Sequence, residues 1–384
     1  MKRFLCFILA IVMLAGLVAC SDDTEASGNE SSEISEGSSA PTYKPEPVIN
    51  GVKLSDYTVV FKNNSGDIVK FSTAAQTFIK KVKEIYGVSL SCVTDSRAEK
   101  ENEIIFGIVD SRDICKDYTQ RYDIGNYCVE VKGKKVLFAA TYANGALGAS
   151  EAFLEKISDM DKVSDMKFEG EKDIVRIACV GDSITYGATS TNKNKTYPAF
   201  LQEMLGLDYY VFNAGISGYS IVSTDQYAYK KTPEFQQAKR FTPDVVLFAL
   251  GTNDANPTDT QPYKNWENPD NNRTKKFIDS TNELLDAFVE VNSDVKIIML
   301  LPSSLFKVGD DGWNADAWNE NLVKYVTPNL KNIAESRKLK TVDLFAWSLE
   351  NKDVFVDGLH PMDDTYKTYA QFIYDSIKND IAKK

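Results

Sequence analysis

The hydrophobic and polar positions along this chain follow two periods, and their alternation predicts its secondary structure. Short apolar runs rich in β-branched residues are typical of strands, whereas an apolar side chain at every third or fourth position is typical of a helix. From residue 48 onward the two patterns alternate almost to the end of the chain. In residues 72–86, for example, we expect a helix whose apolar stripe consists of Ala75, Phe78, Val82 and Ile85.

Residues 48–170 are predicted to form a smaller α/β domain. Strands are expected over residues 57–61, 89–93, 103–108, 127–131 and 136–140. Lys132-Gly133-Lys134 predicts a hairpin between the last two, because a glycine between two alternating runs is typical of a tight turn. A second helix is expected over residues 144–157.

Residues 171–384 alternate strands and helices more regularly. The expected strands cover residues 174–180, 209–212, 245–250, 295–301 and 339–342. The expected helices cover residues 198–205, 274–291, 315–336 and 364–381. Such alternation predicts a parallel sheet with helices on both faces and any active site at the carboxyl ends of the strands.

The first 47 residues are not expected to belong to the folded part. Lys2 and Arg3 precede an apolar run over residues 4–18, and Leu17-Val18-Ala19-Cys20 resembles the lipobox of bacterial lipoprotein signal peptides. Residues 1–20 are therefore predicted to be a signal peptide with Cys20 as the lipidated residue. A plain signal peptide or a membrane anchor is the alternative, although the apolar run is short for a span. Residues 21–47 are almost entirely polar and predict a flexible tether, so we expect an exported protein, anchored by lipid to the bacterial cell membrane and facing outward.

Charge and cysteine content argue against several classes of function. The formal net charge is −11, and no run of Lys and Arg is available to follow a phosphate backbone, so no nucleic acid partner is expected. The cysteines that follow Cys20 lack the close spacing of a metal site, and a disulfide among the first three of them stays open: Cys92, Cys115, Cys128 and Cys179. One histidine is too few for zinc and no glycine loop is suited to phosphate, so we expect no metal and no cofactor.

A candidate nucleophile follows the first strand of the second half. The apolar run over residues 174–180 stops at Gly181-Asp182-Ser183, which predicts a tight turn that displays the Ser183 hydroxyl. The alternative is an ordinary turn in which Asp182 or Ser183 caps the next helix.

Three further motifs follow later strands. They are Asn213-Ala214-Gly215-Ile216-Ser217-Gly218, Gly251-Thr252-Asn253-Asp254 and Asp357-Gly358-Leu359-His360-Pro361. A serine hydroxyl becomes a good nucleophile when an imidazole takes its proton, and a carboxylate on the other ring nitrogen fixes the tautomer. The only histidine, His360, is the candidate base, and Asp357 is the candidate carboxylate.

Negative charge that develops on a carbonyl oxygen needs preorganised donors. The Ser183 amide, the Gly215 amide and the Asn253 side chain are the candidates for this oxyanion hole. Asp182 and Asp254 are expected at most to orient neighbouring loops by accepting backbone hydrogen bonds.

In order and context these four motifs resemble the sequence blocks of the SGNH (GDSL-like) hydrolase family. Any one of them alone could be a turn or a cap, but four at successive strand ends in the family order are not independent turns. The resemblance covers residues 171–384 and implies a five-stranded parallel, flavodoxin-like sheet, with signature residues Ser183, Gly215, Asn253 and His360. It also implies a cofactor-free esterase, lipase, thioesterase or carbohydrate deacetylase. The Gly-x-Ser-x-Gly elbow of α/β-hydrolases is absent, so Ser217 is taken as a loop residue.

The substrate is predicted from less specific features. The element order of residues 48–170 resembles that of the small α/β accessory domain of some glycoside hydrolases. For this domain of the chain, a spacer role is favoured over glycan binding. Trp266 and Trp313 lie in polar loops and are the candidate substrate contacts, whereas Trp318 and Trp347 are expected in the core. Together with the predicted anchor, these features favour removal of acetyl groups from a polysaccharide such as xylan. The alternatives are a lipase or thioesterase for longer acyl chains, or an inactive glycan-binding lipoprotein.

Overall fold

The computed structural model describes residues 42–64, 66–257, 265–308 and 314–382. The predicted signal peptide, Cys20 and most of the tether lie outside these residues, as does Trp313. Within the described part of the chain, no helix is both long and apolar enough to cross a membrane.

The second half of the chain is built on a five-stranded sheet in which every neighbouring pair is parallel. The spatial order β11-β10-β12-β13-β14 places the first strand of this half beside the second and the third. The strands are β10 (Val175–Gly181), β11 (Tyr209–Gly215), β12 (Val245–Ala249), β13 (Lys296–Leu301) and β14 (Lys340–Asp343). This confirms the expected flavodoxin-like sheet, and each expected strand lies within a few residues of its predicted bounds.

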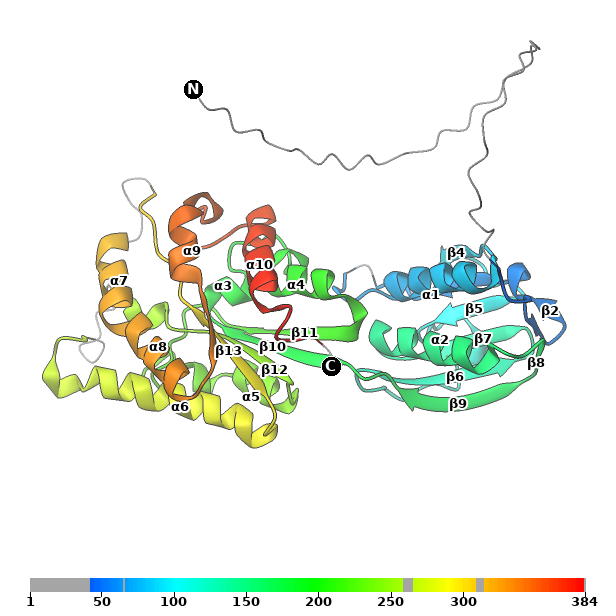
Figure 1. The fold of residues 1–384 in the computed structure, drawn as a ribbon, viewed down its shortest axis with the longest axis horizontal. Helices are drawn as coiled ribbons and strands as arrows, with labels where there is room; N and C mark the ends of the chain where they lie inside the picture. Colours follow the sequence, from blue (N-terminus) through cyan, green and yellow to red (C-terminus); the bar gives the residue numbers. More distant parts are fainter. Residues whose placement is uncertain (1–41, 65, 258–264, 309–313, 383–384) are drawn as a thin grey trace, which may run out of the picture. The chain divides into compact units, whose positions relative to one another are not determined.

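Helices cover both faces of this sheet (Figure 1). One face packs against α4 (Tyr197–Leu205), α9 (Leu344–Glu350) and α10 (Asp364–Ile377), through a core that includes Leu201, Leu344 and Ile373. The other face packs against α5 (Pro233–Arg240), α6 (Arg273–Val291) and α8 (Thr327–Ser336), through a core that includes Phe235, Phe288 and Leu330. Strands that are apolar on both sides follow from this cover, because neither face meets water.

Three helical features differ from the expectation. Helices α5 and α9 were not predicted, because in each only two side chains are buried and the apolar period is too short to detect. The helix expected over residues 315–336 is instead α7 (Ala315–Asn321), a π-helical turn (Leu322–Val326) and α8, whose first turn contains Pro328. Proline has no N–H to donate and is tolerated only at such a helix start.

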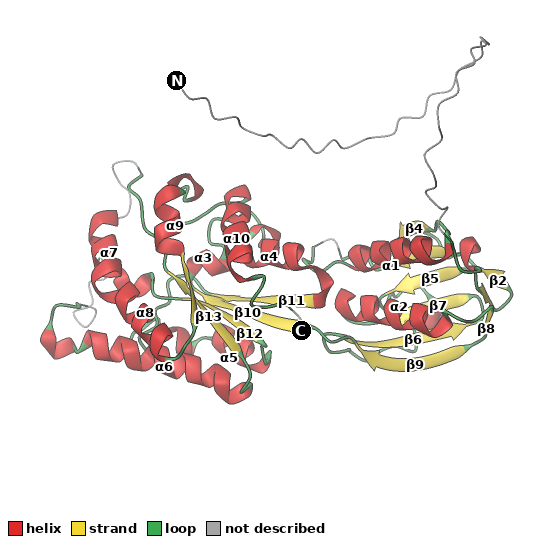
Figure 2. Cartoon of the chain, in the orientation of Figure 1, coloured by secondary structure: helices red, strands yellow, loops and turns green. Residues whose placement is uncertain are grey.

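A separate α/β region precedes this sheet in the chain, and its two α-helices, α1 and α2, separate groups of consecutive strands (Figure 2). Its main sheet has six strands in the order β4-β3-β5-β7-β6-β9. They are β3 (Thr58–Phe61), β4 (Ser91–Thr94), β5 (Glu103–Phe106), β6 (Asn126–Lys132), β7 (Lys135–Ala139) and β9 (Met166–Glu171). Helices α1 (Phe71–Tyr86) and α2 (Ala143–Ile157) lie close to their predicted bounds.

The predicted hairpin is present, since β6 and β7 pair antiparallel with Lys132 opposite Lys135. The remaining strands were not predicted. Strand β9 alternates exposed and half-buried side chains at the sheet edge, and the second sheet consists of two-residue strands: β1 (Val48–Ile49), β2 (Val52–Lys53) and β8 (Lys162–Val163).

All four described cysteines are free thiols, and three of them are buried. Cys179 lies in β10 next to the candidate nucleophile, where burial raises the pKa of its thiol to about 12. Because the thiolate is the reactive form, this side chain acts as a small hydrophobic residue.

Candidate active site

The candidate nucleophile sits at the expected strand-to-helix turn. Strand β10 ends at Gly181, and the four-residue helix α3 (Ser183–Tyr186) begins two residues later. The Asp182 side chain caps this helix by accepting the Ile184 amide at 3.1 Å. A Cβ at Gly181 would lie 1.9 Å from the Thr185 hydroxyl oxygen, so only glycine fits where the chain turns so tightly. The displayed hydroxyl and the capped helix are therefore both features of one turn.

Ser183, His360 and Asp357 form an unbroken chain of hydrogen-bonding groups. Ser183 Oγ lies 2.8 Å from His360 Nε2, and His360 Nδ1 lies 2.8 Å from Asp357 Oδ2. The imidazole is buried, with 7% of its surface exposed. The structure thus brings together the three side chains that the sequence singled out for nucleophilic chemistry.

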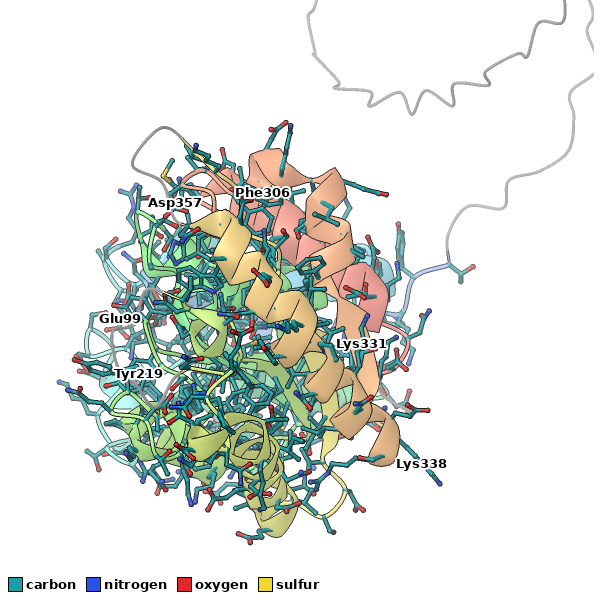
Figure 3. All side chains as sticks on the ribbon, turned by 90° about the vertical axis from the view of Figure 1, so that its left-hand side faces the viewer. Glu99, Tyr219, Phe306, Lys331, Lys338 and Asp357 are labelled. Carbon is teal, nitrogen blue, oxygen red and sulfur yellow. The ribbon has the colours of Figure 1, made fainter. Side chains whose placement is uncertain are left out.

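The loop that carries Asp357 and His360 is fixed by its own hydrogen bonds. Asp357 Oδ1 accepts the amides of Leu359 at 2.9 Å and His360 at 2.7 Å, so the carboxylate is oriented by the loop it belongs to. The loop is closed by an isolated bridge between Phe355 and Pro361. It is held from outside by the Phe306 amide, which donates to the Gly358 carbonyl at 2.8 Å (Figure 3 labels Phe306 and Asp357).

The pKa values of two carboxyl groups at this end of the sheet, Asp357 and Asp182, are shifted in opposite directions. Burial opposes ionisation of Asp357, but hydrogen bonds from the His360 ring and from the His360 and Leu359 amides outweigh it, and the pKa of Asp357 lies below its usual value. Asp182 is buried more completely, and burial raises its pKa despite the Ile184 amide. The carboxylate beside the imidazole is therefore the one held in its charged form.

The three expected oxyanion donors have different surroundings. Ser183 is the first residue of α3, where an N–H has no partner inside the helix. The side-chain amide of Asn253, just after β12, donates one hydrogen bond to the Tyr219 carbonyl at 3.1 Å and has a second N–H. The Gly215 N–H donates to Asn213 Oδ1 at 2.9 Å. The oxyanion roles of all three stay predictions, and that of Gly215 requires its bond to Asn213 to open.

Packing explains why residue 215 is a glycine. A Cβ there would lie 2.2 Å from the Tyr186 amide nitrogen of α3, so the glycine makes room for the helix that carries the nucleophile. Three residues later, Gly218 has φ of 82° and open space where a Cβ would point. Gly218 is the second glycine of this motif and was a visible signal of a turn in the sequence.

Asp254 orients a neighbouring loop, as the sequence suggested. Its Oδ2 accepts the Ile221 amide at 2.8 Å and its Oδ1 accepts the Val222 amide at 3.3 Å. These bonds join the loop after β12 to the loop after β11, which are separated by about thirty residues of chain.

The structure corrects the expectation for Trp266. Its side chain is 9% exposed, and its ring stacks on Tyr325 with centroids 5.1 Å apart, while Nε1 donates to the Asp254 carbonyl at 3.0 Å. Trp266 is thus a packing residue and not a substrate contact. Its polar sequence neighbours gave no sign of Tyr325, which lies on the π-helical turn far along the chain. Trp318 and Trp347 pack in the two cores, as expected.

Among the described residues, no group of His, Cys, Asp and Glu side chains gathers in a way that could hold a metal ion. The site places a serine hydroxyl beside an imidazole and this imidazole beside a carboxylate, which is the set of groups needed for acyl transfer through a serine ester.

Comparison with known proteins finds a family model that matches the part of the chain containing this site and a relative that matches part of the chain. Residues 179–368 match the model of the GDSL-like lipase/acylhydrolase family. An acetylxylan esterase of Xylanibacter ruminicola is 30% identical over 227 residues, an alignment that covers 54% of this chain and 44% of the esterase. The chain therefore spans less than half the length of this relative.

The solved structures that match part of this chain include a carbohydrate acetylesterase family member from Sinorhizobium meliloti and an acetyl xylan esterase. The first is 17% identical, with a TM-score of 0.40, and the match covers 54% of this chain and 99% of that one. The second is 19% identical, with a TM-score of 0.38, and the match covers 53% of this chain and 100% of that one.

Proposed function

Residues 179–368 form a domain of the GDSL-like lipase/acylhydrolase family, and from this premise we propose that the chain is a serine esterase that removes O-acetyl groups from a polysaccharide such as xylan. The observation that carries the proposal is the run of contacts from Ser183 through His360 to Asp357, with both distances at 2.8 Å.

The mechanism follows from the roles of the two imidazole nitrogens. Because the ionised Asp357 accepts a hydrogen bond from Nδ1–H, the lone pair of the neutral ring lies on Nε2, which faces Ser183. Nε2 takes the hydroxyl proton as Oγ attacks the acetyl carbonyl carbon, and then gives this proton to the departing sugar oxygen. Water, deprotonated by the same nitrogen, next attacks the carbonyl carbon of the acetyl-serine. The bond from this carbon to Ser183 Oγ breaks, Nε2 returns the proton to Oγ, and acetate leaves.

Charge on the carbonyl oxygen during both attacks would be stabilised by the Ser183 amide and the Asn253 side chain, with Gly215 as the third expected donor. Donors of this kind typically contribute a factor of about 10² to 10³ in kcat each. Two of these groups belong to elements at adjacent strand ends, β10 and β12, which pair in parallel along Ile177 to Gly181. Because the carboxyl ends of both strands lie at the same edge of the sheet, Ser183 and Asn253, which are seventy positions apart in the sequence, could act on one atom.

The substrate part of the proposal rests on similarity to the acetylxylan esterase and on the polar sequence of residues 255–273 and 306–314. The alternative, cleavage of longer acyl chains, would require an apolar groove for the chain. The two can be separated by chain length, because an acetyl-specific enzyme loses rate steeply as the acyl group of a nitrophenyl ester is lengthened.

The test is release of acetate from acetylated xylan, and of nitrophenol from acetyl and octanoyl esters, by the wild type and by Ser183→Ala and His360→Ala. We expect acetate release by the wild type, preference for the acetyl ester, and a loss of about 10⁴-fold or more in both variants. An inert wild type, or variants that retain activity, would overturn the proposal. Preference for the octanoyl ester would overturn only the choice of acetyl substrate.

We also propose that the protein is exported and anchored to the outer side of the cell membrane by a lipid on Cys20. The support is the sequence Leu17-Val18-Ala19-Cys20 after a short apolar run. In a bacterial host the wild type should partition into the membrane fraction, whereas Cys20→Ala should lose acylation and detach from the membrane. Unchanged membrane retention of Cys20→Ala would contradict lipidation.

The N-terminal α/β region is proposed to be a spacer between the lipid and the esterase domain. The alternative is glycan binding, which its resemblance to accessory domains of glycoside hydrolases keeps open. A glycan-binding screen on the full chain with Ser183 replaced by Ala would separate binding from turnover.

A further inference from the structure

A buried ionic cluster lies behind the candidate oxyanion donors. Arg273, the first residue of α6, donates from Nη1 to Asp225 Oδ1 at 2.7 Å and from Nη2 to Asp225 Oδ2 at 2.9 Å. Its Nη2 also reaches Asp254 Oδ1 at 3.4 Å. All three side chains have no solvent-exposed surface. One guanidinium therefore serves two carboxylates, and all three side chains are shielded from bulk solvent.

These carboxylates hold the loop after β11. Asp254 accepts the amides of Ile221 and Val222, and Asp225 accepts the Ser220 hydroxyl at 2.9 Å. The preceding carbonyl, that of Tyr219, accepts the side chain of Asn253 at 3.1 Å. Each residue from 219 to 222 is thus bonded either to the ionic cluster or to the candidate oxyanion donor itself.

Trp266 joins the same arrangement from another side. Its ring centroid lies 5.5 Å from the guanidinium carbon of Arg273, and its Nε1 donates to the backbone carbonyl of Asp254. Asp254 is the residue next to Asn253, so Arg273 contacts two groups that hold this stretch of backbone, the Asp254 carboxylate and the Trp266 ring.

The electrostatics explain why this position needs a fork-shaped cation. Burial raises the pKa of Asp254 to about 6, and the charge of Asp225 adds to this, while Arg273 and the Ile221 and Val222 amides oppose it. A guanidinium can bond one carboxylate with two parallel hydrogen bonds and still reach a second, whereas a lysine ammonium is a compact point charge. Loss of the fork would leave buried carboxylate oxygens without their donor, and the loop would have to move to compensate.

We propose that Arg273 is a positioning residue of the esterase, which through Asp225 and Asp254 fixes the loop of residues 219–222 and thereby the Asn253 side chain. Arg273 touches no substrate and acts only through these groups. The inference rests on the proposed function, because it takes Asn253 as an oxyanion donor. It predicts that a change at Arg273 weakens binding of the transition state while leaving binding of the ester ground state nearly unchanged.

The chain offers a matched control for the test. Arg112 in the N-terminal α/β region is also buried, with 1% of its side chain exposed, and it bonds Glu103 with two nitrogens at 2.8 and 3.1 Å. Arg273→Lys and Arg112→Lys therefore remove the same kind of buried fork. A merely structural role at residue 273 would make the two variants behave alike in activity per folded molecule.

The experiment measures kcat and KM on 4-nitrophenyl acetate per active site, with sites counted by the nitrophenol burst, and the affinity for phenylboronic acid, which forms a tetrahedral anion on a nucleophilic serine. We expect Arg273→Lys to lower kcat by about 10- to 100-fold with KM within about twofold, and to weaken boronic acid binding by a similar factor. Arg112→Lys should lower Tm but leave kcat per site and boronic acid affinity unchanged.

If Arg273→Lys does not fold, Trp266→Phe decides, since it removes the indole N–H that holds the Asp254 carbonyl while keeping an aromatic ring at this position. We expect it to lower kcat several-fold at constant KM. Unchanged kcat per site in whichever of the two variants folds would overturn the positioning role, even if Tm falls. A wild type that is active while Ser183→Ala is dead preserves the proposed function in that case, whereas an inert wild type would overturn both.

Discussion

At the scale of single residues, the site joins one distant pair and one local pair. Ser183 and His360 are 177 positions apart, whereas Asp357 and His360 are three apart and share a loop. The local pair could be predicted because Asp357 is the nearest acid before the only histidine. The distant pair could be proposed only from the order of motifs along successive strands. The bond from Gly215 to Asn213 had no such signal, because it depends on where a strand ends.

Replacement of Asp357 by Asn tests how far the carboxylate fixes the imidazole. The asparagine amide oxygen can accept a hydrogen bond from Nδ1–H, but its N–H can also donate to Nδ1. In that case the ring proton lies on Nε2, and a protonated Nε2 cannot accept the Ser183 hydroxyl proton. We therefore expect Asp357→Asn to lower kcat on 4-nitrophenyl acetate by about 10³- to 10⁴-fold with KM nearly constant. Steady-state kinetics measure this. A loss below about tenfold would show that the carboxylate is dispensable for the tautomer.

The same variant predicts a pH dependence of stability. The pKa of Asp357 is lower in the folded chain than its usual value, so the folded state favours the carboxylate. Its contribution to stability is therefore present above the pKa of the unfolded chain, about 4, and is lost as the pH falls through the lower folded pKa. Tm measured from pH 7 to pH 3 should show wild type above Asp357→Asn at neutral pH, with the gap closing at acid pH. A gap that widens toward acid would contradict the assigned direction of the shift.

At the scale of elements, the strands were easier to predict than the loops and short helices. The central strands β12 and β13 are apolar on both faces, and this continuous signal located them within a few residues. Trp266 shows the limit of the approach. Its sequence neighbours are polar, and the Tyr325 ring that covers it comes from another element. Packing between distant elements is absent from a local pattern, so a buried aromatic in a polar loop resembles an exposed one.

The loop of residues 355–361 is the element that aligns the proposed base, and Gly358 is the position in it that leaves least room for a side chain. Gly358 has φ of 84°, and a Cβ there would lie 2.1 Å from the Phe306 carbonyl oxygen. Gly358→Ala must therefore shift either this loop or the segment that carries Phe306, and Asp357 and His360 would move with it. We expect kcat to fall by about 10²-fold or more and Tm to drop.

Gly66→Ala is the control for Gly358→Ala. Gly66 has open space around the position of a Cβ and lies in the N-terminal region, so its replacement should change neither kcat nor Tm appreciably. If Gly358→Ala retained wild-type kcat, the loop would be tolerant of displacement, and the alignment of His360 would have to come from elsewhere.

At the scale of the whole molecule, three exposed apolar side chains are close in sequence to the proposed catalytic residues. Tyr186 is 57% exposed and lies three residues after Ser183, Val356 is 45% exposed and precedes Asp357, and Met362 is 42% exposed and follows His360 by two residues. Single exposed apolar residues are ordinary, but several beside one site suggest a surface that a ligand covers. With Trp266 buried, this surface is a candidate for contact with a sugar ring, as is Trp313, which lies outside the described residues.

Tyr186 is the aromatic member of this surface, and we expect it to affect activity on a polysaccharide substrate but not on a substrate without a sugar. A sugar ring stacked on a tyrosine would gain about 0.5 to 1.5 kcal/mol, which is absent for a substrate without the sugar. Tyr186→Ala should thus lower kcat/KM on acetylated xylan by up to about tenfold while changing that on 4-nitrophenyl acetate by less than twofold, and Tyr186→Phe should behave as the wild type. Tyr43→Ala is the matched control, because Tyr43 is a similarly exposed tyrosine, at 47%, outside the esterase domain. Equal losses on both substrates would instead point to distortion of α3, which begins at Ser183, and would remove the argument for a sugar at this surface.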